Sequence, residues 1–152
     1  MTNNDILRRL RYTFDYNDAQ MIALFALVDY TTTRQQVNTW LKKSEEPDFE
    51  ELSDERLAIF LNGLIVEKRG KREGPTPVPE KKLTNNIILR KLKIALNLKD
   101  TDMLAIFDLA NIRVSKHELS ALFRKPHQSQ YRECENQFLR NFLSGLQRKH
   151  RS

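Results

Sequence analysis

The sequence predicts an all-α protein built from two copies of one four-helix unit, and three observations support this. Residues 3–70 align without a gap on residues 85–152, and 19 of the 68 aligned pairs are identical, whereas chance matching at ordinary residue usage gives about 4. Apolar residues in both copies recur three and four positions apart, the spacing of one helix face. The alternating apolar and polar pattern of strands is absent from the sequence.

The first copy divides into four helical segments. The first begins at the candidate N-cap Asn4 and the second opens at Asp18, because both residue types favour helix starts. The third follows the polar turn 30–33, and the fourth follows the acidic connector 45–52 and ends in a basic run. Their apolar stripes are, in order, Ile6, Leu7, Leu10 and Phe14; Met21, Leu24, Phe25 and Val28; Val37, Trp40 and Leu41; and Leu57, Phe60, Leu61 and Leu64.

The second copy repeats each step after an intervening linker. We divide the chain into a first unit (1–70), a Pro-rich charged linker (71–84) that we expect to be extended, and a second unit (85–152). Units of about this size lie near the lower limit for independent folding, so we expect the two to pack on each other with pseudo-twofold symmetry. The stripes of the second copy are Ile88, Leu89, Leu92 and Leu96; Met103, Ile106, Phe107 and Ala110; Leu119, Leu122 and Phe123; and Phe138, Leu139, Phe142, Leu143 and Leu146.

Gly63 and Gly145 occupy the same position in the longest helix of each copy. Glycine inside a helix costs about 1 kcal/mol relative to alanine, so its repetition needs a reason. We predict a close helix crossing at both glycines, with the two long helices meeting on the pseudo-twofold axis. The alternative is an inherited kink without a contact.

Charge is distributed unevenly along the chain. The net charge is −3 over residues 1–70, +2 over residues 71–84 and +7 over residues 85–152. A basic second half favours binding to a polyanion, and the alternative is that solvated helix faces have diverged in charge since the duplication.

The cysteine count and the apolar runs indicate the cellular compartment. A single cysteine, Cys134, fits a reducing compartment. Because no apolar run resembles a signal peptide or approaches the roughly 18 residues of a membrane span, we expect a cytoplasmic protein without membrane contact.

The sequence lacks the residue patterns of the common catalytic and cofactor sites. His117, His127 and Cys134 are not spaced as metal ligands on a helix, and nothing marks Cys134 as an activated nucleophile, so we expect it to fill apolar space. The four glycines form neither a dinucleotide-binding nor a phosphate-binding loop. We therefore expect a protein that is not an enzyme and binds neither metal nor cofactor.

The second and third helices of each copy have the lengths of a helix-turn-helix, most clearly at 101–110, 111–114 and 115–124. The third helix would expose side chains suited to phosphate and base contacts, and the end of the chain is also basic. Two short helices joined by a turn also occur as ordinary packed corners. The predicted DNA-binding or RNA-binding residues are Lys116, His117, Arg124, Lys125, Arg148, Lys149 and Arg151.

A protein-interaction module or homodimer is the alternative to nucleic-acid binding. In that case the basic patch would meet an acidic protein partner. Large aromatic side chains often anchor such interfaces, so exposure of Tyr16, Tyr30 or Trp40 would favour this interpretation.

Four segments are typical of one protein family: NNDILRRLRY and FLNGLIVEKRGK in the first copy, and NNIILRKL and FLRNFLSGL in the second. On these segments the whole chain resembles the bacterial YehS-like family, domain of unknown function 1456, which carries the same domain in tandem. The resemblance implies a bacterial cytosolic protein. It supplies no activity, cofactor or site residue.

Overall fold

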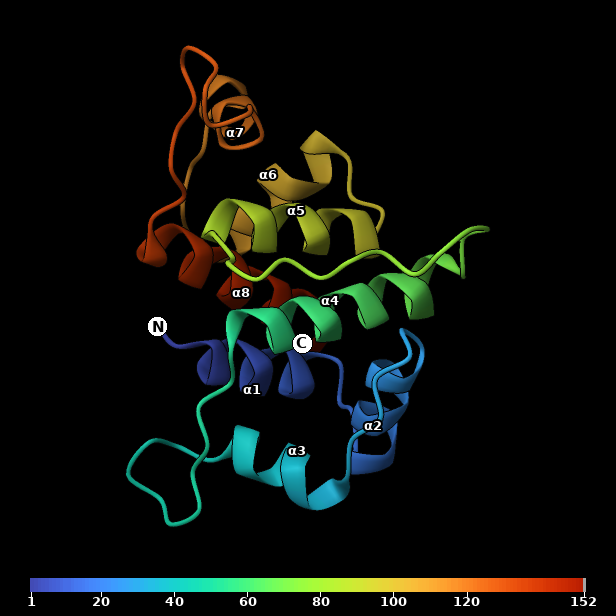
Figure 1. Cartoon of the computed structure of the whole chain (residues 1–152). Helices are drawn as coiled ribbons and strands as arrows, with labels where there is room; N and C mark the ends of the chain where they lie inside the picture. The colour runs from blue at the N-terminus through green and yellow to red at the C-terminus, as the bar shows by residue number, and fades with distance from the viewer. Residues whose placement is uncertain (152) are drawn as a thin grey trace.

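Residues 1–151 are described by the computed structural model, and every regular element among them is an α-helix (Figure 1). The eight helices fall into two groups of four, which confirms the prediction of an all-α fold from duplicated four-helix units. The helices are α1 (Asn3–Thr13), α2 (Asp18–Ala26), α3 (Arg34–Leu41), α4 (Asp54–Arg69), α5 (Asn85–Ala95), α6 (Asp100–Leu109), α7 (Lys116–Leu122) and α8 (Asn136–Arg151).

The N-cap of the first helix in each unit is a threonine, so the prediction of Asn4 as N-cap was wrong. Thr2 adopts an extended backbone and its side chain accepts a hydrogen bond from the backbone of Asp5. Thr84 caps α5 in the same way through the backbone of Ile87. A threonine hydroxyl satisfies one of the free N–H groups of the first turn, which leaves the asparagine side chains for another purpose.

Asn4 instead ties three segments of the first unit together. Its amide nitrogen donates to the carbonyls of Trp40 and Glu50, both at 2.9 Å, and its oxygen accepts from the backbone N–H of Leu52 at 3.0 Å. This joins α1 to the end of α3 and to the connector before α4. Asn86 makes the three equivalent bonds in the second unit, to Leu122, Arg132 and Cys134.

The two units pack reciprocally, as the predicted pseudo-twofold symmetry requires. The first helix of each unit lies against the fourth helix of the other, so α1 contacts α8 and α4 contacts α5. Arg9 donates to Ser144 Oγ at 2.8 Å, and its counterpart Lys91 donates to Asn62 Oδ1 at 2.7 Å. In Figure 1 these four helices form the middle of the molecule, with α3 and α7 at opposite ends.

Gly63 and Gly145 mark close helix crossings, but the crossings lie within each unit. A Cβ on Gly63 would come within 2.0 Å of the Leu24 carbonyl oxygen in α2, and one on Gly145 within 2.0 Å of the Ile106 carbonyl oxygen in α6. The predicted meeting of the two long helices at these glycines was wrong. The second helix of each unit needs the space because it packs directly across the fourth.

The linker between the units is extended and lies along α4 and α5 (Figure 1). Thr76 donates to Asp29 at 2.9 Å near its start. Glu80 pairs with Lys91 at 3.0 Å, and the backbone N–H of Leu83 donates to Asp54 at 2.9 Å. The linker is therefore attached to both units.

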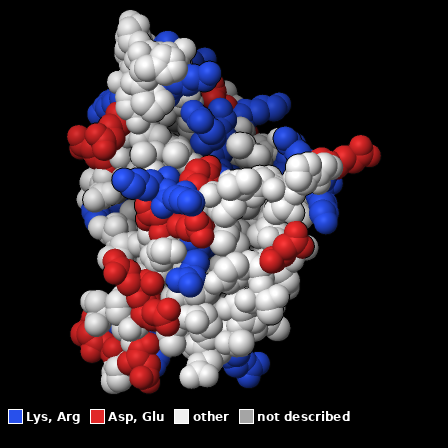
Figure 2. Space-filling model, viewed as in Figure 1, with Lys and Arg blue, Asp and Glu red and all other residues white. Residues whose placement is uncertain are grey.

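The charge asymmetry of the sequence persists on the folded surface. On the face in Figure 2, Asp and Glu gather over the first-unit end beside α3, whereas Lys and Arg are spread over the second-unit half. Within residues 1–151, no helix combines the length and apolar character needed to cross a membrane.

Candidate anion-binding sites

The predicted basic residues fall into two separate groups. Arg148 and Arg151, in the last turn of α8, both bind other parts of the fold. Arg148 donates to the carbonyl of Leu109 at 2.6 Å, at the end of α6. Arg151 pairs with Asp15 at 3.4 Å and lies 4.2 Å from the ring centre of Tyr12, both in the first unit. Arg151 thus contributes to the interface between the units, Arg148 binds within its own unit, and Lys149 beside them is exposed.

The other predicted residues flank α7. Lys116 and His117 are exposed in its first turn, and Lys125 is exposed just after its end. Arg124 is half-buried, and its Nε has no hydrogen-bond partner among residues 1–151. A seven-residue helix is about 10 Å long, so these cations lie within the span of a few nucleotides.

The loop after α7 has the geometry of its counterpart after α3 but a different charge. The backbone N–H of Lys43 donates to Glu46 at 3.0 Å, and that of Lys125 donates to Gln128 at 2.8 Å. Residues 42–52 hold two Lys against five Asp or Glu, whereas residues 124–134 hold three Lys or Arg against one Glu. Four acidic positions of the first loop, Glu45, Glu46, Asp48 and Glu50, are occupied in the second by His127, Gln128, Gln130 and Arg132. The hydrogen bond that the two loops share therefore does not require the charge of either loop.

A second site lies at the corner between α4, the linker and α5, and sequence reasoning missed it. This corner pocket has a volume of about 560 Å³, within the usual range for small-molecule sites. Its lining is apolar at Ile65, Ile94, Leu98 and Phe123, among others. The charged lining residues are Arg69, Lys71, Arg72, Arg90, Lys93 and Glu73.

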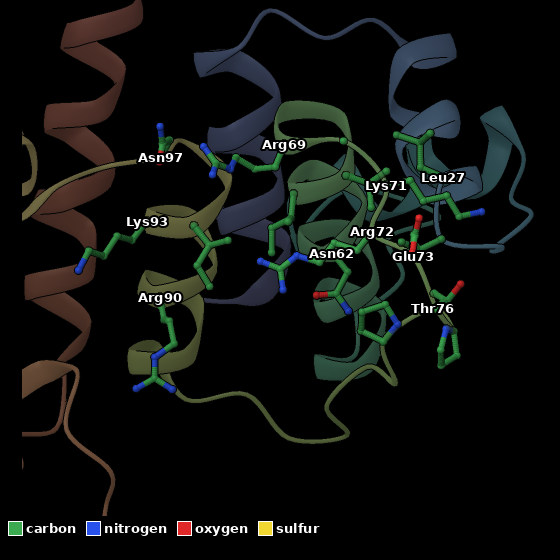
Figure 3. Close-up of a pocket in the computed structure, with 18 of the residues that line it drawn as sticks. Leu27, Asn62, Arg69, Lys71, Arg72, Glu73, Thr76, Arg90, Lys93 and Asn97 are labelled. Carbon is green, nitrogen blue, oxygen red and sulfur yellow. The ribbon is translucent and has the colours of Figure 1, made fainter.

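The cations of the corner pocket differ in how they are held. Arg90 donates to the Phe123 carbonyl at 3.0 Å, and Lys93 pairs with Asp100 at 3.1 Å. For residues 1–151 the structure gives Arg69 and Arg72 no side-chain hydrogen bond or ion pair. In Figure 3 the Arg69 side chain extends toward Asn97, whereas Lys71 points away from α5.

Cys134 does not contribute to either site. It is 2% exposed, and burial raises the pKa of its thiol to about 11. A thiol in this state is neither a good nucleophile nor a metal ligand at neutral pH, and the prediction that it fills apolar space is confirmed. Across residues 1–151, His, Cys, Asp and Glu side chains form no group of three or more with the geometry to hold a metal ion.

The fold defines the class: an all-α protein of two tandem four-helix units that carries two basic sites. Comparisons with known proteins then show the family to which the chain belongs. The chain belongs to the family described as protein of unknown function DUF1456, whose model matches residues 3–70 and again 85–152. It is 46% identical over 147 residues to the uncharacterized protein YehS of Escherichia coli (strain K12), covering 96% of this chain and 94% of YehS. No solved structure matches significantly.

Proposed function

We propose that this protein is a non-enzymatic nucleic-acid-binding protein that contacts DNA or RNA through the basic face of its second unit. This α7 face consists of Lys116, His117, Arg124 and Lys125. The observation that carries the proposal is the pair of connector loops. The same hydrogen-bonding pattern occurs with five acidic residues in one unit and with a single one in the other, so this pattern does not require a basic loop, and we infer that the charge serves binding.

The chemistry of the α7 face suits a phosphate backbone. Lys and Arg side chains neutralise phosphates and release counterions, which supplies most of the affinity of non-specific binding. α6 and α7 would act as the helix-turn-helix-like corner, with the start of α7 pointing toward the nucleic acid. Lys149 would extend the contact, whereas Arg148 and Arg151 support the proposal less because the fold already uses them.

A protein-interaction module remains the second candidate, and the aromatic side chains do not favour it. Trp40 is 0% exposed and Tyr16 is 8% exposed. Tyr30 is half-buried and accepts a hydrogen bond from Arg56 at 3.0 Å. These three residues therefore belong to the core and are not available as anchors for a partner.

The internal repeat supplies a matched pair of variants to test nucleic-acid binding. Lys116→Glu/Lys125→Glu alters the α7 face, and Arg34→Glu/Lys43→Glu makes the equivalent change at the same positions of the first unit. Both variants change the net charge by the same amount. Fluorescence anisotropy with labelled 20-nucleotide single-stranded DNA, duplex DNA and duplex RNA is measured from 50 to 200 mM salt.

We expect the α7 variant to lose at least tenfold in affinity and to have a shallower salt dependence, whereas the first-unit variant stays within about threefold. Equal losses in both variants would mean that net charge alone drives binding. Absence of binding to all three probes at 50 mM salt would reject the proposal. In that case, concentration-dependent sedimentation would examine self-association.

A further inference from the structure

We propose that the corner pocket between α4, the linker and α5 binds a small organic phosphate of the nucleotide class. This inference concerns a different site from the α7 face and stands independently of it. Its basis is a comparison of the two corners that the pseudo-twofold symmetry makes equivalent. In one, called the filled corner, the arginine at the helix end has partners within the protein; in the other, called the open corner, it has none among residues 1–151.

The filled corner lies where α8 ends against α1. There Arg151 pairs with Asp15 at 3.4 Å and covers the ring of Tyr12 at 4.2 Å. The cation at the end of the helix has an acidic partner and an aromatic partner from the other unit.

The open corner lies where α4 ends against α5. Arg69 occupies the position of Arg151, but Asn97 stands where the first unit has Asp15, and Ile94 stands where it has Tyr12. Arg69 therefore keeps its charge without the counter-charge, and the smaller aliphatic side chain leaves space. The favourable effect of a cation at a helix end explains an arginine at both corners, but it does not explain why only one of the two arginines has an acidic partner.

The linker adds further cations to the open corner and forms one of its walls. Gly70 (φ +86°) lets the chain leave α4 in a left-handed turn, and the next residues, Lys71 and Arg72, line the pocket. In Figure 3 the Arg72 guanidinium points toward α5 and that of Arg69 extends toward Asn97, whereas Arg90 lies on the side of α5 away from α4. Guanidinium groups form paired hydrogen bonds with phosphate oxygens, so Arg69 and Arg72, which have no partner among residues 1–151, suit an anion with several oxygens.

Asn62 supplies a buried polar group at the same place. The residue is only 6% exposed, and its oxygen accepts from Lys91 at 2.7 Å. Its amide nitrogen donates to no atom of residues 1–151, although the residue lines the pocket (Figure 3). This nitrogen is not one of the buried side-chain atoms that lack a partner, so it is accessible from the pocket and can donate to a ligand or to water.

The class of ligand follows from the combination of these surfaces. The basic groups recognise phosphate, and the apolar lining at Ile65, Ile94, Leu98 and Phe123 accommodates a planar or apolar body. The pocket volume of about 560 Å³ exceeds what inorganic phosphate needs and suits a mononucleotide. The free amide of Asn62 is placed to hydrogen-bond a ligand oxygen or ring nitrogen.

Isothermal titration calorimetry at constant ionic strength tests the proposal with ADP, pyrophosphate and adenosine as probes. We expect ADP to bind with a Kd below 1 mM, pyrophosphate at least fivefold more weakly and adenosine not measurably. Equal affinity for ADP and pyrophosphate would overturn the nucleotide assignment, and absence of ADP binding at 1 mM would overturn the site. Binding of a single-stranded oligonucleotide here, with no binding of ADP, would also overturn it.

Asn97→Asp is the decisive variant because it rebuilds the counter-charge of the filled corner. The backbone there accepts aspartate, since Asn97 has φ 53° and its counterpart Asp15 has φ 55°. The matched control Asn111→Asp changes the same residue type at another left-handed position, whose counterpart is Asp29. We expect a loss of ADP affinity of at least tenfold in Asn97→Asp and less than twofold in Asn111→Asp.

A second variant, Arg69→Gln, tests the same pocket without relying on the result for Asn97→Asp. Arg69 is exposed, so its replacement preserves the fold, and thermal unfolding verifies this. We expect at least a fivefold loss of ADP affinity, with Arg113→Gln, an exposed cation outside the pocket lining, as control. Unchanged affinity in both Asn97→Asp and Arg69→Gln would overturn the proposal. Nucleic-acid binding by the α7 face is expected to be unaffected in both variants, so the two proposals fail separately.

Discussion

Gly63 lies directly against the carbonyl oxygen of Leu24, so close that a Cβ at this glycine would come within 2.0 Å of that oxygen. The oxygen belongs to the backbone of α2 and cannot move without displacing the helix. The same relationship joins Gly145 to Ile106 in the second unit. Each unit thus depends on one glycine for the crossing of its second and fourth helices.

We predict that Gly63→Ala and Gly145→Ala each lower the free energy of unfolding by about 3 kcal/mol, because α2 or α6 has to shift to make room. An alanine in an ordinary helix position would instead raise it by up to about 1 kcal/mol. Urea unfolding followed by circular dichroism measures the difference. A stability equal to or above that of the wild type would show that the crossing is not tight.

Loss of the three hydrogen bonds of the Asn86 side chain is expected to destabilise the second unit strongly. Asn86→Ala removes the side chain that serves two carbonyls and one N–H group, and leaves at least part of them without partners. We predict a loss of about 3 kcal/mol, since each buried unsatisfied group costs about 1–3 kcal/mol and water reaches some of them. The control is Asn38→Ala, at an exposed position. We expect it to change the free energy of unfolding by no more than about 0.5 kcal/mol. Chemical denaturation of both variants would settle the comparison.

The internal repeat was enough to predict the architecture. The roles of the residues that the two copies share, such as Asn4 and Gly63, became clear only from the structure. Periodic apolar positions located all eight helices because burial of one face determines helix packing. Asn4 was predicted as an N-cap because capping is a local effect, but its side chain binds atoms up to 48 positions away. The corner pocket was hidden for the same reason. Its lining comes from α4, the linker and α5, and the difference between Asn97 and Asp15 matters only once α4 is known to end beside α5.

Stability at alkaline pH is expected to depend on Cys134. Its folded-state pKa of about 11 lies above the usual value of 9.0, so the native state holds the thiol proton more tightly than the unfolded state does. The resulting stabilisation is complete below pH 9 and is lost as the pH rises toward 11. We predict a decline of about 2–3 kcal/mol over this interval, which Cys134→Val lacks.

Urea denaturation of wild type and Cys134→Val at pH 8, 9, 10 and 11 measures this decline. Comparing the two proteins removes the contribution of other groups, such as Tyr16, whose pKa is also raised by burial and by its hydrogen bond to Glu67. In addition, the thiol of the native protein is expected to react with iodoacetamide far more slowly at pH 8 than that of the urea-unfolded protein. If the free energy of unfolding fell in parallel with pH for the two proteins, the decline could not be assigned to Cys134.

The two units are expected to stay together when the linker is cut. Val78 is 87% exposed in the middle of the linker, so a protease site inserted after it is accessible. The reciprocal packing of α1 on α8 and of α4 on α5 holds the units through buried apolar faces, with Arg9–Ser144 and Lys91–Asn62 as matching hydrogen bonds. We predict that the cleaved protein elutes from size-exclusion chromatography at the volume of the intact chain and separates only in denaturant. Separation under native conditions would mean that the linker itself maintains the interface by keeping the local concentration of the units high.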